Sequence, residues 1–202
     1  MSRAARPWLP RFLRNVLLWL VPAWAVWALF APGYNRFLLA SGQNLLHLTE
    51  YPSATLLVPQ GPHDARITRL DLGKTLEKGF RVTDLHFHLV LLLALFLAVP
   101  DVPWRERLSH LGWALLVTIF FDIFLVFSTV KSIYATQLGA WSLANYGPFA
   151  RNAYGLLHHL LDLPGKLSLP LVLWAAFYLP LLLNPTPASP RAGTRSAPQG
   201  DR

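Results

Sequence analysis

The chain has 202 residues, of which 53% are hydrophobic and 14% are charged, and its formal net charge is +8. Soluble domains carry about 25% charged residues, so this composition indicates a membrane protein. The chain has no cysteines, which excludes disulfides, thiolate metal sites and a cysteine nucleophile. The basic residues flank apolar runs and form no single basic face, so we expect contact with membrane lipids and no nucleic-acid binding.

Four apolar stretches predict a membrane α-helical fold with about four transmembrane helices, at residues 15–32, 85–100, 111–130 and 169–183. A weak signal-peptidase pattern at Ala23–Ala25 lies inside the first stretch, but the run stays apolar beyond it, which favours an uncleaved span. The fourth stretch is shorter than the roughly 20 residues that a span needs. Either it crosses a thin membrane with little tilt, or the helix predicted before it continues it.

The orientation follows from the arginines beside the first two loops. The basic N-terminus, residues 1–14, precedes the first span, and Arg105 and Arg107 lie in the short loop 101–110 between the second and third spans. Positive residues favour the cytoplasmic side, so both segments are predicted to be cytoplasmic. The expected location is the bacterial inner membrane, with both termini in the cytoplasm and a disordered tail at 184–202 that is rich in Pro, Ala, Ser, Gly and Arg.

Two longer segments, 33–84 and 131–168, are then extracytoplasmic. The first begins with apolar residues at helical spacing, which predicts an amphipathic helix at the membrane interface. Alternating residues and turn signals after it predict a small β region with two or three short strands, too small to be stable alone. The second segment carries an apolar stripe over 149–163, which predicts another interfacial helix that ends before Pro164.

Asp122 is the strongest candidate for a functional residue, because it lies inside a continuous apolar run. A carboxylate at that depth costs a few kcal/mol and must face protein or water, so it is either functional or a structural hydrogen-bonding group. His86 and His88 open the second span. In a helical hairpin about Trp104 they lie at the depth of Asp122, so the three are predicted to form a polar cluster. Alternatively, both histidines anchor the chain among the lipid headgroups.

No metal, cofactor or catalytic residue is predicted. The pair His86 and His88, with Asp122, has ligand chemistry, but two residues apart they diverge on a helix. The sequence contains no Gly-rich phosphate loop and no Gly-x-Ser-x-Gly motif. Trp104, Arg105 and Arg107 are typical of an interface anchor and are candidates for contact with lipid phosphate or a cytoplasmic partner.

The order of these features resembles a known family. The N-terminal RFLRNVLLWLVPAWAVWALFAP, the strand region after it and FHLVLLLALFLAVPDVPWRERL before the third span resemble the exosortase H-associated membrane proteins. The resemblance covers roughly residues 11–140. It implies an accessory protein of a bacterial sorting system for exported proteins. Exosortases act through Cys, Arg and His, and the missing cysteine forbids carrying that activity over, so no catalytic position is transferred.

Two functions remain as hypotheses. The first is a non-enzymatic accessory or assembly protein of an exosortase-type system, acting through its extracytoplasmic face on a sortase-like enzyme or its substrate, for example by strand addition to an open sheet edge. The second is a membrane enzyme that uses Asp122 with His86 or His88 as acid–base residues on a lipid-linked or peptide substrate. A small transporter has less support, because no repeats or paired broken helices are visible.

Overall fold

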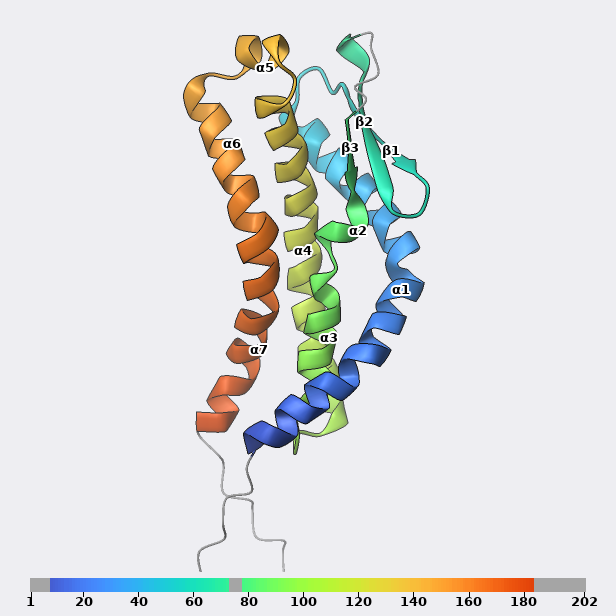
Figure 1. Ribbon diagram of the computed structural model, residues 1–202, viewed down its shortest axis with the longest axis vertical. Helices are drawn as coiled ribbons and strands as arrows, with labels where there is room; N and C mark the ends of the chain where they lie inside the picture. Colours follow the sequence, from blue (N-terminus) through green and yellow to red (C-terminus); the bar gives the residue numbers. More distant parts are fainter. Residues whose placement is uncertain (1–7, 73–77, 184–202) are drawn as a thin grey trace, which may run out of the picture.

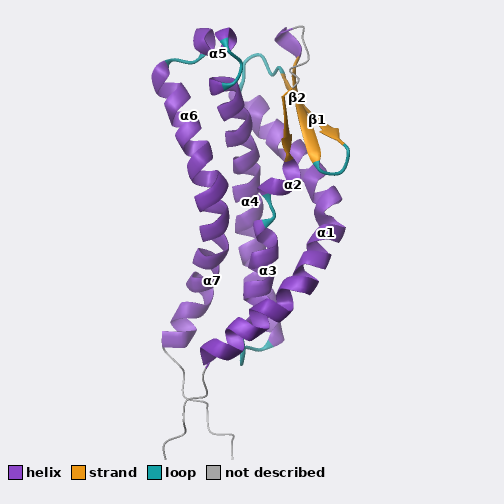
Figure 2. Cartoon of the chain, in the orientation of Figure 1, coloured by secondary structure: helices purple, strands orange, loops and turns teal. Residues whose placement is uncertain are grey.

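The computed structural model describes residues 8–72 and 78–183, which form seven helices and a small sheet (Figure 2). Three helical stretches are long and apolar enough to cross a membrane, namely Trp8–Thr49, Trp104–Thr136 and Pro148–Pro180. The prediction of a helical membrane protein with a small β region is confirmed at this level. The predicted disordered tail, 184–202, and the first seven residues of the basic N-terminus lie outside the described residues.

The first helix, α1 (Trp8–Thr49), is a single element of 42 residues. The predicted division into a span ending at residue 32 and a separate interfacial helix is therefore wrong. Pro22 and Pro32 lie inside α1, where each removes a backbone hydrogen bond and bends a helix without ending it. Packing holds the second half, because its buried side chains recur at helical spacing, at Ala31, Asn35, Leu38, Gly42 and Leu46.

Two helices replace the predicted second span. They are α2 (Val82–Leu85) and α3 (His88–Ala98), and His86 between them has φ −121° and ψ 15°, which interrupts the helix. The eleven residues of α3 rise only about 16 Å, roughly half of the hydrocarbon thickness. No Gly or Pro marks this interruption in the sequence, so it depends on the partners of His86 that are described below.

The third span, α4 (Trp104–Thr136), has 33 residues and is longer than predicted at both ends. Trp104, Arg105 and Arg107 lie in its first turns and not in the predicted loop of residues 101–110, which shortens to residues 99–103. The sequence Trp-Arg-Glu-Arg-Leu consists largely of good helix formers, and Glu106 in the first turn interacts favourably with the helix dipole.

The last part of the chain settles the choice left open for the short fourth stretch. After the short α5 (Ala140–Asn145), the helix α6 (Pro148–Leu160) runs through a π-helical turn at Leu161–Gly165 into α7 (Lys166–Leu183). The predicted end before Pro164 and the separate interfacial helix are wrong. A π turn has a wider hydrogen-bonding pattern than an α-helix and accommodates Pro164, which has no N–H to donate. Residues 148–165 therefore extend α7.

Three antiparallel strands form the sheet in the order β1–β2–β3: β1 (Thr55–Gln60), β2 (Asp64–Arg69) and β3 (Lys78–Arg81). A short 3-10 turn, Leu70–Leu72, follows β2. The buried side chains of Leu57, Ala65 and Ile67 join a core with the second halves of α1 and α4. As predicted, the sheet is not independent and rests on the helices.

The outer edge of β1 is covered by α1. The Gln43 side-chain oxygen accepts the Leu57 N–H at 2.9 Å, and His47 Nε2 lies 2.6 Å from the Thr55 carbonyl oxygen. Among the described residues β3 forms the other edge of the sheet. Strand addition by a partner, if it occurs, is therefore restricted to the β3 side.

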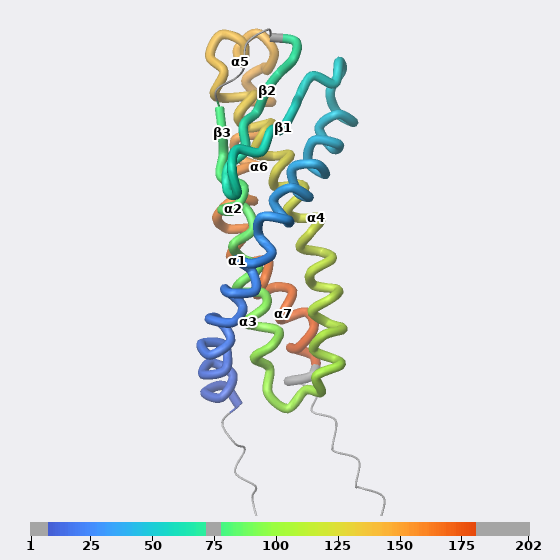
Figure 3. The backbone as a smooth tube through the Cα atoms, turned by 90° about the vertical axis from the view of Figure 1, so that its right-hand side faces the viewer, coloured from blue at the N-terminus to red at the C-terminus, as the bar shows by residue number. Residues whose placement is uncertain are grey.

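The elements form an elongated bundle. The beginning of α1, the turn between α3 and α4 and the end of α7 lie together at one end, and the sheet and α5 lie at the other (Figures 1 and 3). A second apolar core fills the end that lacks the sheet, where Phe12 of α1, Phe96 of α3 and Tyr178 of α7 are buried together.

A cluster of four buried polar side chains connects the sheet to the helices. Lys131 Nζ lies 3.1 Å from Glu50 Oε1, and both side chains are 7% exposed. The Thr55 hydroxyl donates to Glu50 Oε2 at 2.5 Å and accepts from the Tyr134 hydroxyl at 2.8 Å. These contacts join the end of α1, the start of β1 and the last turns of α4.

Arg69 at the end of β2 adds a second attachment. Its guanidinium lies 4.6 Å from the Trp141 ring centroid and 5.0 Å from that of Tyr134, a cation–π arrangement. It also donates two hydrogen bonds to Asp71, at 2.9 and 2.6 Å, and they lower the pKa of that carboxyl. The sheet is thereby attached to the corner between α4 and α5.

We expect Lys131→Met to lower the free energy of unfolding by about 3 kcal/mol, because it leaves the Glu50 carboxylate buried without its partner. The double variant Glu50→Gln/Lys131→Met should recover most of that loss. Chemical unfolding in detergent, followed by circular dichroism, measures both. As a control, Asp64→Ala removes an exposed pair with Arg81 at 3.8 Å and should cost less than about 1 kcal/mol. Equal losses for Lys131→Met and Asp64→Ala would contradict the anchoring role.

Candidate functional site

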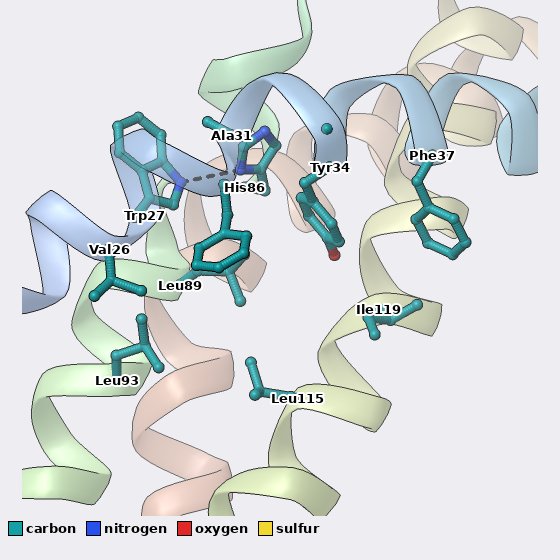
Figure 4. A pocket seen from close by; sticks show the side chains of 12 residues that line it. Val26, Trp27, Ala31, Tyr34, Phe37, His86, Leu89, Leu93, Leu115 and Ile119 are labelled. Carbon is teal, nitrogen blue, oxygen red and sulfur yellow. Dashed lines mark hydrogen bonds between the residues drawn. The ribbon is translucent and has the colours of Figure 1, made fainter.

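The predicted polar residues gather where the interruption between α2 and α3 faces α1 and α4. His86 and His88 are both buried there, and Asp122 of α4 is fully buried beside them. Figure 4 shows His86 between Trp27 and Tyr34, two side chains that α1 presents to it. The interruption matters for this arrangement, because on one continuous helix two residues two positions apart would diverge.

His86 is held from both ring nitrogens. The Trp27 indole N–H donates to His86 Nδ1 at 3.0 Å, and His86 Nε2 lies 2.5 Å from the Asn35 side-chain oxygen. Since an indole nitrogen can only donate, Nδ1 must be the acceptor and Nε2 must carry the proton. His86 is thus a neutral imidazole in one defined tautomer, with its hydrogen-bonding capacity filled.

Asn35 extends this network to the sheet. Its amide nitrogen donates to the Pro62 carbonyl at 2.7 Å and to the Thr83 hydroxyl at 3.1 Å. Because a carbonyl can only accept, the contact with Pro62 fixes which end of the amide faces His86. The Thr83 hydroxyl is also 3.1 Å from His63 Nδ1. One buried side chain therefore links α1, the turn between β1 and β2, and the start of α2.

Asp122 forms a second polar group with different partners. The Tyr34 hydroxyl donates to Asp122 Oδ2 at 2.8 Å, and His88 Nε2 lies 3.4 Å from Asp122 Oδ1. The structure therefore brings Asp122 and His88 together, whereas His86 turns to Trp27 and Asn35. Within the described residues neither nitrogen of His88 nor Oδ1 of Asp122 makes a hydrogen bond. The His88 ring instead packs edge-on against Phe121, with centroids 5.8 Å apart.

Burial limits what these groups can do chemically. The side chains of His88 and Asp122 are 0% exposed, and neither lines the adjacent cavity, which His86 and Tyr34 border. A substrate in that cavity would meet the ring of Tyr34 before it met Asp122. This geometry favours the structural interpretation of Asp122 over an acid–base role. Over residues 8–72 and 78–183, no group of three or more His, Asp or Glu side chains is placed to hold a metal ion.

Lys166 connects the last helix to the same region. Its ammonium donates to the Asp84 carbonyl at 3.0 Å, pairs with Asp162 one turn earlier and lies 5.6 Å from the Phe87 ring centroid. The lysine is only 5% exposed. It therefore ties the start of α7 to the interruption between α2 and α3.

Trp104, Arg105 and Arg107, at the opposite end of the bundle, differ in what their side chains contact. Arg107 donates to the Val102 carbonyl at 2.8 Å and to the Leu97 carbonyl at 3.0 Å, so it caps the open end of α3. Trp104 is 49% exposed and stacks on Trp19 at 6.2 Å. Arg105 is exposed. Of the three candidates for lipid or partner contact, Trp104 and Arg105 remain available, and Arg107 serves the fold.

Sequence reasoning missed three members of the network: Trp27, Tyr34 and Asn35. All three lie on α1. The expected helix end near Pro32 separated Tyr34 and Asn35 from the first span, and Trp27 lies inside that predicted span. A polar Asn between apolar residues of one helical stripe was the available signal, because such a residue requires a partner when the stripe is buried.

Comparisons with known proteins identify no relative. No protein-family model matches the sequence, and neither curated proteins nor solved structures give a match.

Asn35→Ala should lower the free energy of unfolding by about 2–3 kcal/mol, because it leaves the His86 N–H and the Pro62 carbonyl without a partner. Asn44→Ala is the matched control, since Asn44 is exposed on the same helix and should change stability by less than about 0.5 kcal/mol. Thermal unfolding in one detergent compares the two. Equal changes in stability for Asn35→Ala and Asn44→Ala would contradict the stabilising role of the Asn35 hydrogen bonds.

A second prediction concerns Asp122. Asp122→Asn can still accept the Tyr34 hydroxyl and should be tolerated, whereas Asp122→Leu should destabilise the fold by about 1–3 kcal/mol, because it leaves the Tyr34 hydroxyl unpaired. Unfolding in detergent measures stability, and recovery of the partner proposed below measures function. Loss of function in a stably folded Asp122→Asn protein would overturn the structural interpretation.

Proposed function

We propose that this protein is a non-enzymatic accessory protein of the bacterial inner membrane, which binds a partner protein through its extracytoplasmic face. In the proposed topology α1, α4 and α7 cross the membrane, the segment of α2 and α3 makes a fourth crossing, and the sheet, α5 and most of α6 lie outside the cytoplasm. Arg14 near the start of α1 and Arg105 at the start of α4 lie at the end of the bundle that also holds the end of α7 (Figure 1). Positive residues in the short segments beside the spans support a cytoplasmic location for this end and for both termini, whereas charges in longer segments such as residues 33–84 count little in this rule.

One observation carries the proposal: α6 presents its apolar side outward. The exposed apolar residues follow one stripe along the helix, at Phe149 (86% exposed), Leu156 (61%), Leu160 (55%) and Leu163 (63%). Arg151, Tyr154 and His158 lie on the partly buried inner side, where His158 Nδ1 is 3.4 Å from the Thr129 hydroxyl of α4, whereas Asn152 and His159 are exposed. Such an inverted helix is stable only where its outer side meets lipid or another protein.

The depth of this stripe favours a protein over lipid. Arg107 and Lys131 bracket the apolar part of α4, and the helical rise from one to the other is about 36 Å, compared with a hydrocarbon thickness of about 30 Å. Because His158 contacts Thr129, Leu156 lies close to the level of Lys131, and Phe149 lies two turns farther out. The outer half of the stripe therefore extends beyond the hydrocarbon, where exposed apolar surface is typical of an interface.

The state of the polar cluster agrees with a role other than catalysis. His86 is held by two hydrogen bonds as a neutral imidazole, and His88 and Asp122 are enclosed. A general acid or base must come within hydrogen-bonding reach of its substrate. His88 and Asp122 have no such access, and His86, which borders the cavity, has both ring nitrogens in hydrogen bonds. The cluster therefore supports a structural role that fixes the outer surface.

The resemblance to exosortase-associated proteins suggests the partner. We propose that the outward side of α6 contacts a membrane helix or juxtamembrane segment of a sortase-like enzyme or of its membrane-anchored substrate. An apolar stripe that continues from α6 into α7, where Leu167 and Leu171 are exposed, suits helix-to-helix packing along both the membrane and its outer boundary.

The test is photo-crosslinking in intact cells from a photoreactive amino acid at position 156, followed by purification in mild detergent. The expected product contains the sortase-like enzyme or its anchored substrate. Leu156→Glu should reduce co-purification about tenfold, which corresponds to about 1.4 kcal/mol of binding free energy.

Leu48→Glu is the matched control, because Leu48 is 84% exposed near the end of α1 and lies outside the proposed surface. It should leave co-purification unchanged. Recovery of the monomer alone, or equal losses for the two glutamate variants, would contradict the proposed function.

A further inference from the structure

A groove on the side of the bundle is not used by the proposed partner surface. It has a volume of about 460 Å³ and is walled by α1, α3 and α4, with Trp27, Gly33, His86, Leu93, Leu115 and Ile119 among its lining residues (Figure 4). Several residues of its rim are exposed, including Val26 (48%), Phe30 (66%) and Phe37 (47%). The groove is therefore open to the surroundings of the bundle along α1.

The groove offers an occupant no free hydrogen-bonding group from its three polar lining side chains. The Trp27 indole N–H is taken by His86, and both His86 nitrogens have partners. The Tyr34 hydroxyl is directed to Asp122. The remaining lining is aliphatic or aromatic, so any occupant must be apolar along the length that enters the groove.

The position of the groove relative to the charges of α1 defines its depth. Within α1, no Arg or Lys lies between Arg14 and Arg36, a distance of about 33 Å along the axis, which matches the hydrocarbon thickness. Gly33 lines the groove, and Arg36 follows it by three residues, about one turn. The groove therefore lies in the half of the hydrocarbon nearer the sheet, and Arg36, which does not line it, lies at the level of its outer end, where Phe37 borders it.

Size and charge together identify the occupant. One turn of a helix, about 11 Å wide with side chains, fills about 500 Å³, so the groove has room for about one turn and cannot receive a spanning helix. A single alkyl chain fits such a space. Arg36 is exposed and, among the described residues, is paired with no carboxylate. A phosphate of a lipid headgroup is the anion available at that level.

We propose that the groove binds one acyl chain of a phospholipid from the leaflet on the sheet side, with its phosphate at Arg36. Arg36 also borders a polar hollow that contains Asp64, and Asp64 is engaged by Arg81 at 3.8 Å. The bound lipid fills the space between α1 and the interruption before α3, next to the hydrogen bond of Trp27 with His86. This site is independent of the partner surface on α6.

The test uses the full chain in nanodiscs that contain a phosphatidylglycerol with a photoreactive diazirine in the middle of one acyl chain. After irradiation, peptide mass spectrometry should locate adducts preferentially on groove residues such as Leu93 and Leu115. Ile119→Trp fills the groove and should reduce these adducts about fivefold or more. Phe120→Trp is the matched control, because Phe120 is 66% exposed on the same helix and does not line the groove.

Gly33→Leu is a second groove-filling variant, because a Cβ at Gly33 would meet no heavy atom within 4 Å. It should reproduce the loss without disturbing the packing. Arg36→Gln should weaken labelling by the phospholipid probe and leave labelling by an uncharged diacylglycerol probe unchanged. Adducts spread evenly over groove and exposed residues, or unaffected by both filling variants, would overturn the acyl-chain site. Equal weakening of both probes by Arg36→Gln would overturn the phosphate contact.

Discussion

The buried hydrogen bonds of Asn35 are the constraint on which the rest of this structure depends. This one amide holds the neutral ring of His86 on one side and the Pro62 carbonyl and Thr83 hydroxyl on the other. Without these hydrogen bonds we expect the helix to continue through His86, because a continuous helix satisfies all backbone N–H and C=O groups in an apolar environment. The interruption in turn places α2 beneath the sheet and gives α1 a surface to pack against.

The extramembrane part is attached by a second set of polar contacts at the far end of α1 and α4. The Glu50–Lys131 pair is buried and hydrogen bonded through Thr55 to Tyr134. Arg69 adds aromatic stacking. The three short strands bury their apolar face against the helices and need that packing for stability, so these contacts hold the sheet as an extension of the helices. A rigid outer end suits a protein that acts by presenting a surface.

The helix α6 shows that an amphipathic pattern does not by itself indicate which side of a helix faces the rest of the protein. From the sequence, its stripe of Phe149, Leu156 and Leu160 predicts a side that rests on the membrane interface, with the polar side in water. In the structure Arg151, Tyr154 and His158 are partly buried, with His158 beside Thr129 of α4, and the apolar stripe is exposed. Periodicity identified the two sides of the helix correctly, but it could not indicate which one faces the protein, because α4 supplies buried polar groups at the same level.

The sequence by itself determined the class of protein, the approximate positions of the apolar helices, the short strands and the shared depth of Asp122 with His88. These properties depend on local composition and periodicity, which a single segment carries. Only the tertiary structure decided that α1 continues past Pro32, that His86 interrupts the second span and that α6 continues into α7. Each of these outcomes depends on hydrogen bonds or packing with residues far away in the sequence, such as Asn35 with His86, and no local pattern encodes which distant partner will satisfy a buried polar group.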